Sequence, residues 1–180
     1  MNIREIKNII LTAFLGLLVL PFSLRAQQFS EKEVKAAFLC NFPLFIEWPE
    51  NSFSSSSSPI IIGVLNDTAL ATITKRVGGN VKISGREIQV IQYKNLDEVK
   101  NCQILFIGSS YKNNLTSIVS KISDKPILTV GETEGFCKQK GMIGFSKKKS
   151  KFGFDINDKI ARRSGIKISS KLLMLATIVE

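Results

Sequence analysis

The sequence contains no histidine and only three cysteines among 180 residues. Without histidine, it lacks the commonest general base, the usual serine and cysteine catalytic triads, and the commonest transition-metal ligand. Cys40, Cys102 and Cys137 are far apart and form no CxxC pair, so neither a zinc site nor a thioredoxin-like motif is indicated. We therefore predict that the protein has no metal site and no cofactor, and that it is not an enzyme.

Three motifs for nucleotide and acyl chemistry are also missing. The sequence has no G-x-G-x-x-G, no G-x-x-x-x-G-K-[ST] and no G-x-S-x-G, so dinucleotide-binding, P-loop and hydrolase functions lack their residues. Asp67 and Glu132 offer a carboxylate pair, but Asp67 is better explained as a helix cap. These observations leave the binding of other molecules as the main class of function.

The first 26 residues have the pattern of a secretory signal peptide. A basic start is followed by an apolar run at 9–20, a break at Pro21, and a usable cleavage site at 24–26. The run is shorter than the roughly 20 residues that a transmembrane helix needs, although an uncleaved membrane anchor is the alternative. We predict an exported mature protein, residues 27–180, that forms one domain.

The chain is strongly basic, with 25 lysines and arginines, 15 acidic residues and a formal charge of +10. Loss of the signal peptide removes three basic residues and one acidic residue, which leaves +8. In an exported protein such a charge favours an anionic membrane surface, an acidic polymer or an acidic partner over nucleic acid. Simple solubility is the alternative explanation of the charge.

The stretch 30–49 predicts a helix that other elements must cover on more than one side. Ser30 followed by Glu33 is a capping box, which satisfies backbone N–H groups at the start of a helix. Residues 36–46 are almost all apolar, so both faces of this helix need a cover. Pro43 removes one helical hydrogen bond and is expected to kink the helix.

Four aromatic side chains of this stretch are candidates for a partner or dimer interface, namely Phe38, Phe42, Phe45 and Trp48. Aromatic anchors dominate the binding energy of interfaces, and monomers rarely leave such a patch exposed. The alternative is that they are ordinary core residues beneath a second apolar helix, which is predicted to begin at Ser169 or Ser170 and to include the last residues of the chain. For Phe38 and Phe42 the core alternative is favoured.

The middle of the chain predicts an α/β fold. Apolar strands alternate with short amphipathic helices, which is typical of βαβ units with a parallel sheet. Two later strands joined by a short lysine-rich connection predict an antiparallel hairpin. We expect a Rossmann-like, mostly parallel sheet flanked by helices, with a C-terminal antiparallel hairpin. The predicted strands are 59–65, 86–93, 104–107, 125–131, 141–146 and 151–157, the helices are 68–77 and 112–122, and serines 54–58 form a flexible connector or variable surface loop.

One edge of this predicted sheet is a candidate for binding a small ligand. Asn66, Ser109 and Glu132 each follow a predicted strand. The carboxyl ends of parallel strands lie at one edge, and ligands of such sheets bind beyond it. We therefore name these three residues as a candidate ligand edge.

Five segments together resemble the YfiR family of exported bacterial domains. They are Glu47-Trp48-Pro49 at the end of the first helix, Cys102 before the central strand, GMIGF at 141–145, FDIN at 154–157 and ISSKLL at 168–173. The resemblance runs in order through the whole mature chain. It implies a Rossmann-like domain that acts as a dimeric periplasmic repressor, binding the periplasmic part of an inner-membrane diguanylate cyclase and lowering cyclic-di-GMP output.

In the YfiR family the cysteines report the oxidising state of the compartment, and the resemblance extends this role to the present chain. Cys102 matches the family pattern, Cys137 lies where some members carry a cysteine, and Cys40 takes a position that is commonly aromatic. We predict a disulfide between Cys102 and Cys137, with Cys40 free, because the first two should lie near the amino ends of neighbouring strands.

The predicted function is that of an exported, non-enzymatic regulator. It would bind the periplasmic domain of an inner-membrane signalling protein, a diguanylate cyclase by resemblance, and shift that protein toward its inactive population. The alternative is a periplasmic small-ligand-binding module that serves another membrane receptor, such as a histidine kinase, with its site at Asn66, Ser109 and Glu132.

Overall fold

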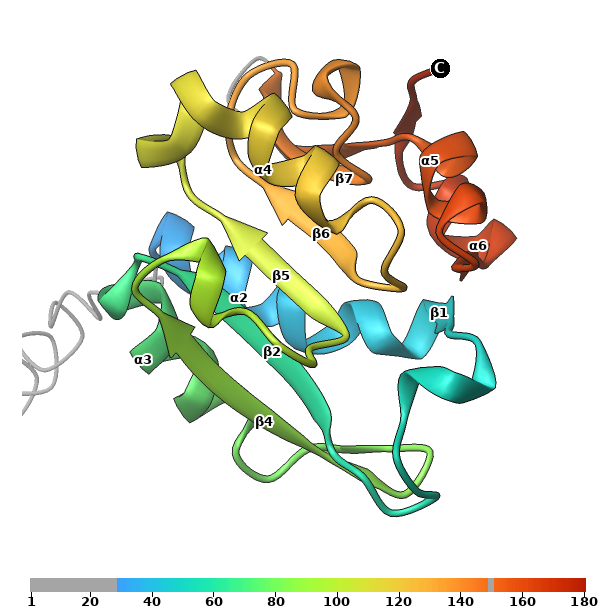
Figure 1. Ribbon diagram of the computed structural model, residues 1–180. Coiled ribbons are helices and arrows are strands. Elements are labelled where there is room, and N and C mark those ends of the chain that lie inside the picture. The colour runs from blue at the N-terminus through green and yellow to red at the C-terminus, as the bar shows by residue number, and fades with distance from the viewer. Residues whose placement is uncertain (1–28, 149–150) are drawn as a thin grey trace, which may run out of the picture.

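The computed structural model describes residues 29–148 and 151–180, so the predicted signal peptide at 1–26 lies outside the described residues. Within these ranges the main sheet has eight strands in the order β10-β8-β7-β6-β5-β2-β4-β3 (Figure 1). The strands are β2 (Ile60–Leu65), β3 (Lys82–Ile83), β4 (Arg86–Tyr93), β5 (Ile104–Ile107), β6 (Leu128–Gly131), β7 (Ile143–Lys148), β8 (Lys151–Ile156) and β10 (Thr177–Ile178), and β1 (Ile46–Glu47) pairs separately with β9 (Lys167–Ile168).

The sheet confirms the predicted fold class. Strands β4, β2, β5, β6 and β7 are parallel neighbours, and β7 and β8 form the predicted antiparallel hairpin. Strands β5 and β6 are buried along their whole length, as expected for parallel strands covered on both faces. The covering helices are α2 (Glu31–Asn41), α3 (Thr68–Gly78), α4 (Leu115–Ile122), α5 (Asp158–Arg163) and α6 (Ser170–Leu173).

Two hydrophobic clusters hold the helices on opposite faces of the sheet. Helices α2 and α3 cover one face and α4 covers the other (Figure 1). Under α2 lies an aromatic cluster in which neighbouring rings have centroids 5.2–6.4 Å apart. Packing at these distances adds to the free energy gained from burial alone. The aromatic cluster consists of Phe38, Phe42, Phe106, Phe145, Phe152 and Phe154.

Phe136 shows how closely the second cluster is packed. Its ring is 1% exposed and lies between the end of β6 and the start of β7. A Cβ atom at Gly131 or at Gly141 would lie 2.1 Å from this ring. Only glycine therefore fits at these two positions, because such an approach is far inside van der Waals contact.

The first helix is shorter than predicted. Its capping box is confirmed, with Ser30 Oγ accepting from the Glu33 N–H and the Glu33 carboxylate accepting from the Ser30 N–H at 2.9 Å. However, α2 ends at Asn41 instead of being kinked and continuing. Proline has no N–H to donate within a helix, and Pro43 instead lies in a 3-10 turn, η2 (Phe42–Phe45), that leads into β1.

The predicted C-terminal helix is wrong beyond its first turn. Helix α6 ends at Leu173, and Thr177 and Ile178 form β10, which pairs in parallel with β8 at one edge of the sheet. The Val179 N–H continues this pairing by donating to the Ile156 carbonyl at 2.8 Å. Three consecutive β-branched residues at 177–179 favour an extended chain, which explains the change of structure.

The serine loop 54–58 is exposed, as a surface loop should be, but it has defined contacts. Arg86 on β4 donates to the carbonyl oxygens of Ser55 and Ser58 at 2.9 and 2.6 Å. The same guanidinium lies 3.9 Å from the centre of the Phe53 ring, which is cation–π geometry. One arginine thus fastens this connection to the sheet.

Candidate functional site

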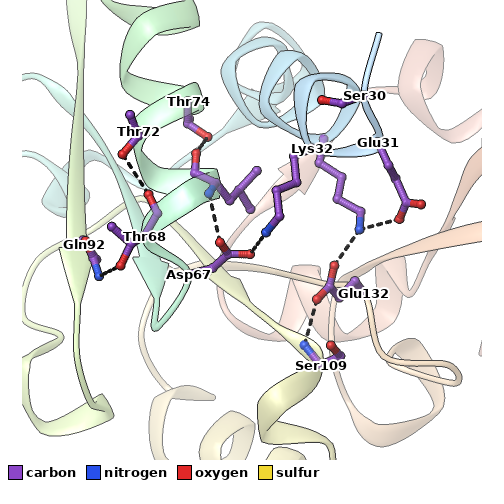
Figure 2. A network of polar contacts seen from close by, with 12 residues as sticks. Ser30, Glu31, Lys32, Asp67, Thr68, Thr72, Thr74, Gln92, Ser109 and Glu132 are labelled. Carbon is purple, nitrogen blue, oxygen red and sulfur yellow. Dashed lines mark hydrogen bonds and ion pairs between the residues drawn. The ribbon is translucent and has the colours of Figure 1, made fainter. Parts of the chain in front are cut away.

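The candidate ligand edge brings together two of its three predicted residues. The Ser109 backbone N–H, just after β5, donates to Glu132 Oε1 at 2.9 Å, just after β6 (Figure 2). Glu132 Oε2 accepts from Lys35 Nζ at 2.6 Å, and Lys35 also pairs with Glu31 at 2.6 Å. We call Glu31, Lys35, Ser109 and Glu132 the charged edge cluster.

Asn66 does not join this cluster. Its side chain is exposed, and its backbone, with φ of 54°, turns the chain from β2 into α3. The following residue, Asp67, caps α3 by accepting from the Leu70 N–H at 2.9 Å, as predicted, and pairs with Lys32 (Figure 2). Asp67 and Glu132 therefore bind separate lysines and do not form a carboxylate pair.

Lys35 is the residue of this site that the sequence analysis missed. Its side chain is 9% exposed, although most lysines lie in solvent. Burial acts to lower the pKa of Lys35, but hydrogen bonds and charge from Glu132 and Glu31 outweigh it and raise the pKa. The sequence signal was its position, because Val34, Ala36 and Ala37 surround it with apolar residues.

The two carboxylates of the cluster are held in their charged form. Burial acts to raise the pKa of Glu132, yet the hydrogen bonds from Lys35 and from the Ser109 N–H lower it overall. The hydrogen bond and the charge of Lys35 also lower the pKa of Glu31. At neutral pH the cluster therefore carries one positive and two negative charges.

A pocket of about 310 Å³ opens beside the charged edge cluster. Its other wall comes from the hairpin, where Phe145 and Phe152 present aromatic surface and Lys147 adds a cation. Charges of both signs beside aromatic rings suit a ligand that has a polar group and an apolar body. A pocket therefore lies beside Ser109 and Glu132, two of the three residues named for the candidate ligand edge.

Of the four predicted interface aromatics, one is fully buried and three are half-buried. Phe42 is 1% exposed and lies in the aromatic cluster, so its assignment as an interface candidate is corrected to a core residue. Phe38, Phe45 and Trp48 are half-buried against the same core. Trp48 is further fixed by its Nε1–H, which donates to the Gln103 carbonyl at 3.2 Å.

The most exposed apolar surface lies instead at the C-terminal edge of the sheet. Met174, Leu175 and Ile178 are 78%, 71% and 50% exposed. A groove beside them is lined by β8 residues, including Phe152, and by residues 174–177. Phe152 also lines the pocket of the charged edge cluster, so the two surfaces adjoin. We call Met174, Leu175 and Ile178 the C-terminal apolar edge.

Comparison with known proteins now places the chain. Residues 32–177 match the YfiR/HmsC-like family. The chain belongs to this family. The YfiR/HmsC-like family is a regulatory one, in agreement with the resemblance described above. A search among curated proteins found no match.

Solved structures share the fold at low sequence identity. A conserved domain protein from Vibrio cholerae O1 biovar El Tor superposes with a TM-score of 0.55 at 10% identity, covering 84% of this chain. The ABC domain from Streptococcus pneumoniae in complex with L-Trp superposes with a TM-score of 0.52 at 13% identity, covering 82%. The chain spans 60% of the length of each of these two structures.

Within residues 29–148 and 151–180, no helix has both the length and the apolar character to cross a bilayer. In the same ranges no three side chains among cysteine, aspartate and glutamate are grouped as metal ligands would be.

The predicted disulfide between Cys102 and Cys137 is not formed, and all three cysteines are free and buried. The sulfur of Cys137 packs against Gly144, which is in register with Gly131 and, through it, with Ile107. Cys102 lies five residues before Ile107, or about 16 Å along the strands. A disulfide needs Cα atoms within about 7 Å. The prediction failed because the strands are staggered. Cys137 packs near the amino end of β7, which lies beside the carboxyl ends of β5 and β6, whereas Cys102 precedes the amino end of β5.

Replacement of Glu132 by glutamine should lower the free energy of unfolding by about 1–3 kcal/mol at pH 7, since a partly buried hydrogen bond between two charged groups is lost. Because folding lowers the pKa of Glu132, its charged form stabilises the fold fully at pH values above 4.5, the ordinary pKa of a glutamate. This contribution is lost as the pH falls through the pKa of Glu132 in the folded state. Urea titrations at several pH values measure the difference between wild type and Glu132→Gln, which should shrink below pH 4.5. The exposed pair of Glu87 with Lys82 provides the control Glu87→Gln, and an equal loss in that control would contradict the role of the cluster.

The thiols should all be reduced and unreactive in the folded protein. Burial raises the pKa of Cys40 to about 11, and that of Cys102 and of Cys137 to about 12. Because the thiolate is the reactive form, iodoacetamide at neutral pH should label none of them before unfolding. In denaturant without reductant, mass spectrometry should count three adducts. A count of one without reductant and three with reductant would reveal a disulfide and contradict this prediction.

Proposed function

We propose that the protein is an exported regulator that binds the periplasmic domain of an inner-membrane diguanylate cyclase and represses it, which lowers cyclic-di-GMP. The observation that carries this proposal is membership of the YfiR/HmsC-like family over residues 32–177. Export through removal of residues 1–26 and a homodimeric state belong to the same proposal. Repression requires only that the regulator bind the inactive conformation of the cyclase more tightly than the active one.

The C-terminal apolar edge supports a role in binding another protein. Met174, Leu175 and Ile178 expose large apolar side chains within five residues, at the outer strand of the sheet. Exposed apolar groups that gather at one place mark interaction sites more often than scattered ones do. We therefore assign the cyclase-binding surface to this edge rather than to Phe42, which is buried.

Deletion of the gene should raise cyclic-di-GMP in the host, and the wild-type protein should restore the low level. The double variant Met174→Glu with Leu175→Glu should fail to restore it. Burying two carboxylates in an apolar interface should weaken binding to the cyclase by roughly fiftyfold or more. Both residues are exposed, so the fold should tolerate the change. Cyclic-di-GMP is measured by mass spectrometry, with immunoblots to show equal amounts of exported protein.

The matched control for this experiment is Val77→Glu with Val81→Glu, which places the same charges at other exposed apolar side chains. This control should repress like the wild type. Repression that survives in the C-terminal double variant would place the binding surface elsewhere, and an unchanged cyclic-di-GMP level in the deletion strain would refute repression itself.

A second candidate function is that of a small-ligand sensor, and the pocket beside the charged edge cluster favours it. Lys35 and Glu132 supply polar partners there, and Phe145 and Phe152 supply apolar surface. The Streptococcus pneumoniae domain of similar fold was solved with L-Trp, which suggests aromatic amino acids as the first probes. Because Phe152 also lines the C-terminal groove, a ligand here would adjoin the proposed binding surface.

For the second candidate, L-Trp in excess should raise the melting temperature, since a ligand that binds only the folded state stabilises it. Phe152→Ala should reduce this shift by removing the aromatic wall. Phe53→Ala, which removes a half-buried phenylalanine outside the pocket, should leave the shift unchanged. The absence of any shift with L-Trp, L-Phe and L-Tyr would count against a sensor of aromatic amino acids.

A further inference from the structure

A separate cavity of about 140 Å³ lies between α4, the connection from β6 to β7, and α5. Its apolar lining comes from four side chains, of which three are almost fully buried. The cavity has no part in the charged edge cluster or the C-terminal apolar edge, which other residues form. The apolar lining consists of Val119, Ile122, Met142 and Ile160.

The cavity lies where the two hydrophobic clusters meet. Val119 and Ile122 belong to the cluster under α4, whereas Met142 belongs to the cluster under α2. Beside it, Ser164 at the end of α5 donates its hydroxyl to the Ser123 carbonyl at 2.9 Å, just after α4. This hydrogen bond fixes the spacing of the two helix ends and leaves the gap between them open.

The mouth of the cavity is positively charged. Lys140 and Arg163 both lie at its rim, together with one acidic residue, Asp124. Within the described part of the chain, neither Lys140 nor Arg163 makes a side-chain hydrogen bond or ion pair. Lys140 is held there by a left-handed backbone with φ of 68°. Lys140 and Arg163, which have no side-chain partner within the described residues, therefore lie beside the apolar lining of the cavity.

We propose that this cavity binds a small aromatic carboxylate, with the ring against the apolar lining and the carboxylate between Arg163 and Lys140. A cavity of about 150 Å³ accommodates a benzene ring, so the volume fits one ring and no more. A guanidinium can hold a carboxylate through two parallel hydrogen bonds. The hydroxyl groups of Ser120 and Ser123 line the same rim and offer further polar contacts.

The test uses benzoate as the probe and benzyl alcohol as its neutral match, each titrated into the labelled protein and followed by NMR. Benzoate should cause saturable shifts of the methyl signals of Val119, Ile122, Met142 and Ile160. It should bind at least roughly tenfold more tightly than benzyl alcohol, because charge-assisted hydrogen bonds are the stronger ones. The double variant Arg163→Gln with Lys140→Gln should reduce benzoate affinity to about that of benzyl alcohol.

The matched control is Arg162→Gln with Lys138→Gln, which removes the same charges from adjacent positions. Arg162 Nε forms an ion pair with Asp158 Oδ2 at 2.6 Å, and neither control residue lines the cavity. This control should bind benzoate like the wild type. The proposal is overturned if benzoate causes no saturable shift, if benzyl alcohol binds equally well, if both double variants lose affinity alike, or if the shifts fall at Phe145 and Phe152 instead.

Discussion

The arrangement of this protein depends on the neutralisation of one buried ammonium group. Lys35 is carried by α2 over the carboxyl ends of β5 and β6, where its side chain is withdrawn from water. A charge in that position is costly unless it is paired, and Glu132 from the end of β6 supplies the partner. The same carboxylate accepts the N–H of Ser109 at the end of β5. One ion pair thereby fixes the first helix to two central strands and sets the position of the aromatic cluster beneath it.

This arrangement also limits what the edge of the sheet can bind. In open α/β sheets, backbone N–H groups beyond the strand ends commonly hold an anionic ligand. Here the Ser109 N–H already donates to the carboxylate of Glu132, so an anionic ligand would have to displace that carboxylate. A ligand of this pocket is therefore expected to use the aromatic wall of Phe145 and Phe152 as well as the charges. The chain has no histidine, the commonest general base, and the Glu132 carboxylate at this edge is already held by Lys35 and by the Ser109 N–H.

The sequence was most informative where a local rule has few alternatives. The capping box at Ser30, the Asp67 cap and the apolar strands were all predictable. Both the hydrogen bonds that cap a helix and the spacing of apolar residues in a strand depend on residues close in the sequence. The shared edge of Ser109 and Glu132 was predictable because each follows a parallel strand, but the same rule also named Asn66, which does not join them. Lys35 was missed because its burial depends on a partner almost a hundred residues away. The C-terminal strand was missed because Thr177 and Ile178 pair with β8, whose edge is not visible in the local pattern. The Cys137 position depends on sheet register, which a single sequence leaves open.

These features together bear on how a signal would enter the proposed regulator. The three thiols are buried in different surroundings, Cys40 against Thr74, Cys102 in the cluster under α4 and Cys137 against Met142, and none of them forms a disulfide. By contrast, Phe152 forms part of both the pocket at the charged edge cluster and the groove at the C-terminal apolar edge. A change in the orientation of one half-buried ring costs far less than unfolding of the core, since such a side chain keeps some rotamer freedom. A bound molecule that repositions Phe152 would therefore alter the proposed partner surface at a lower cost in free energy than oxidation of the buried thiols would.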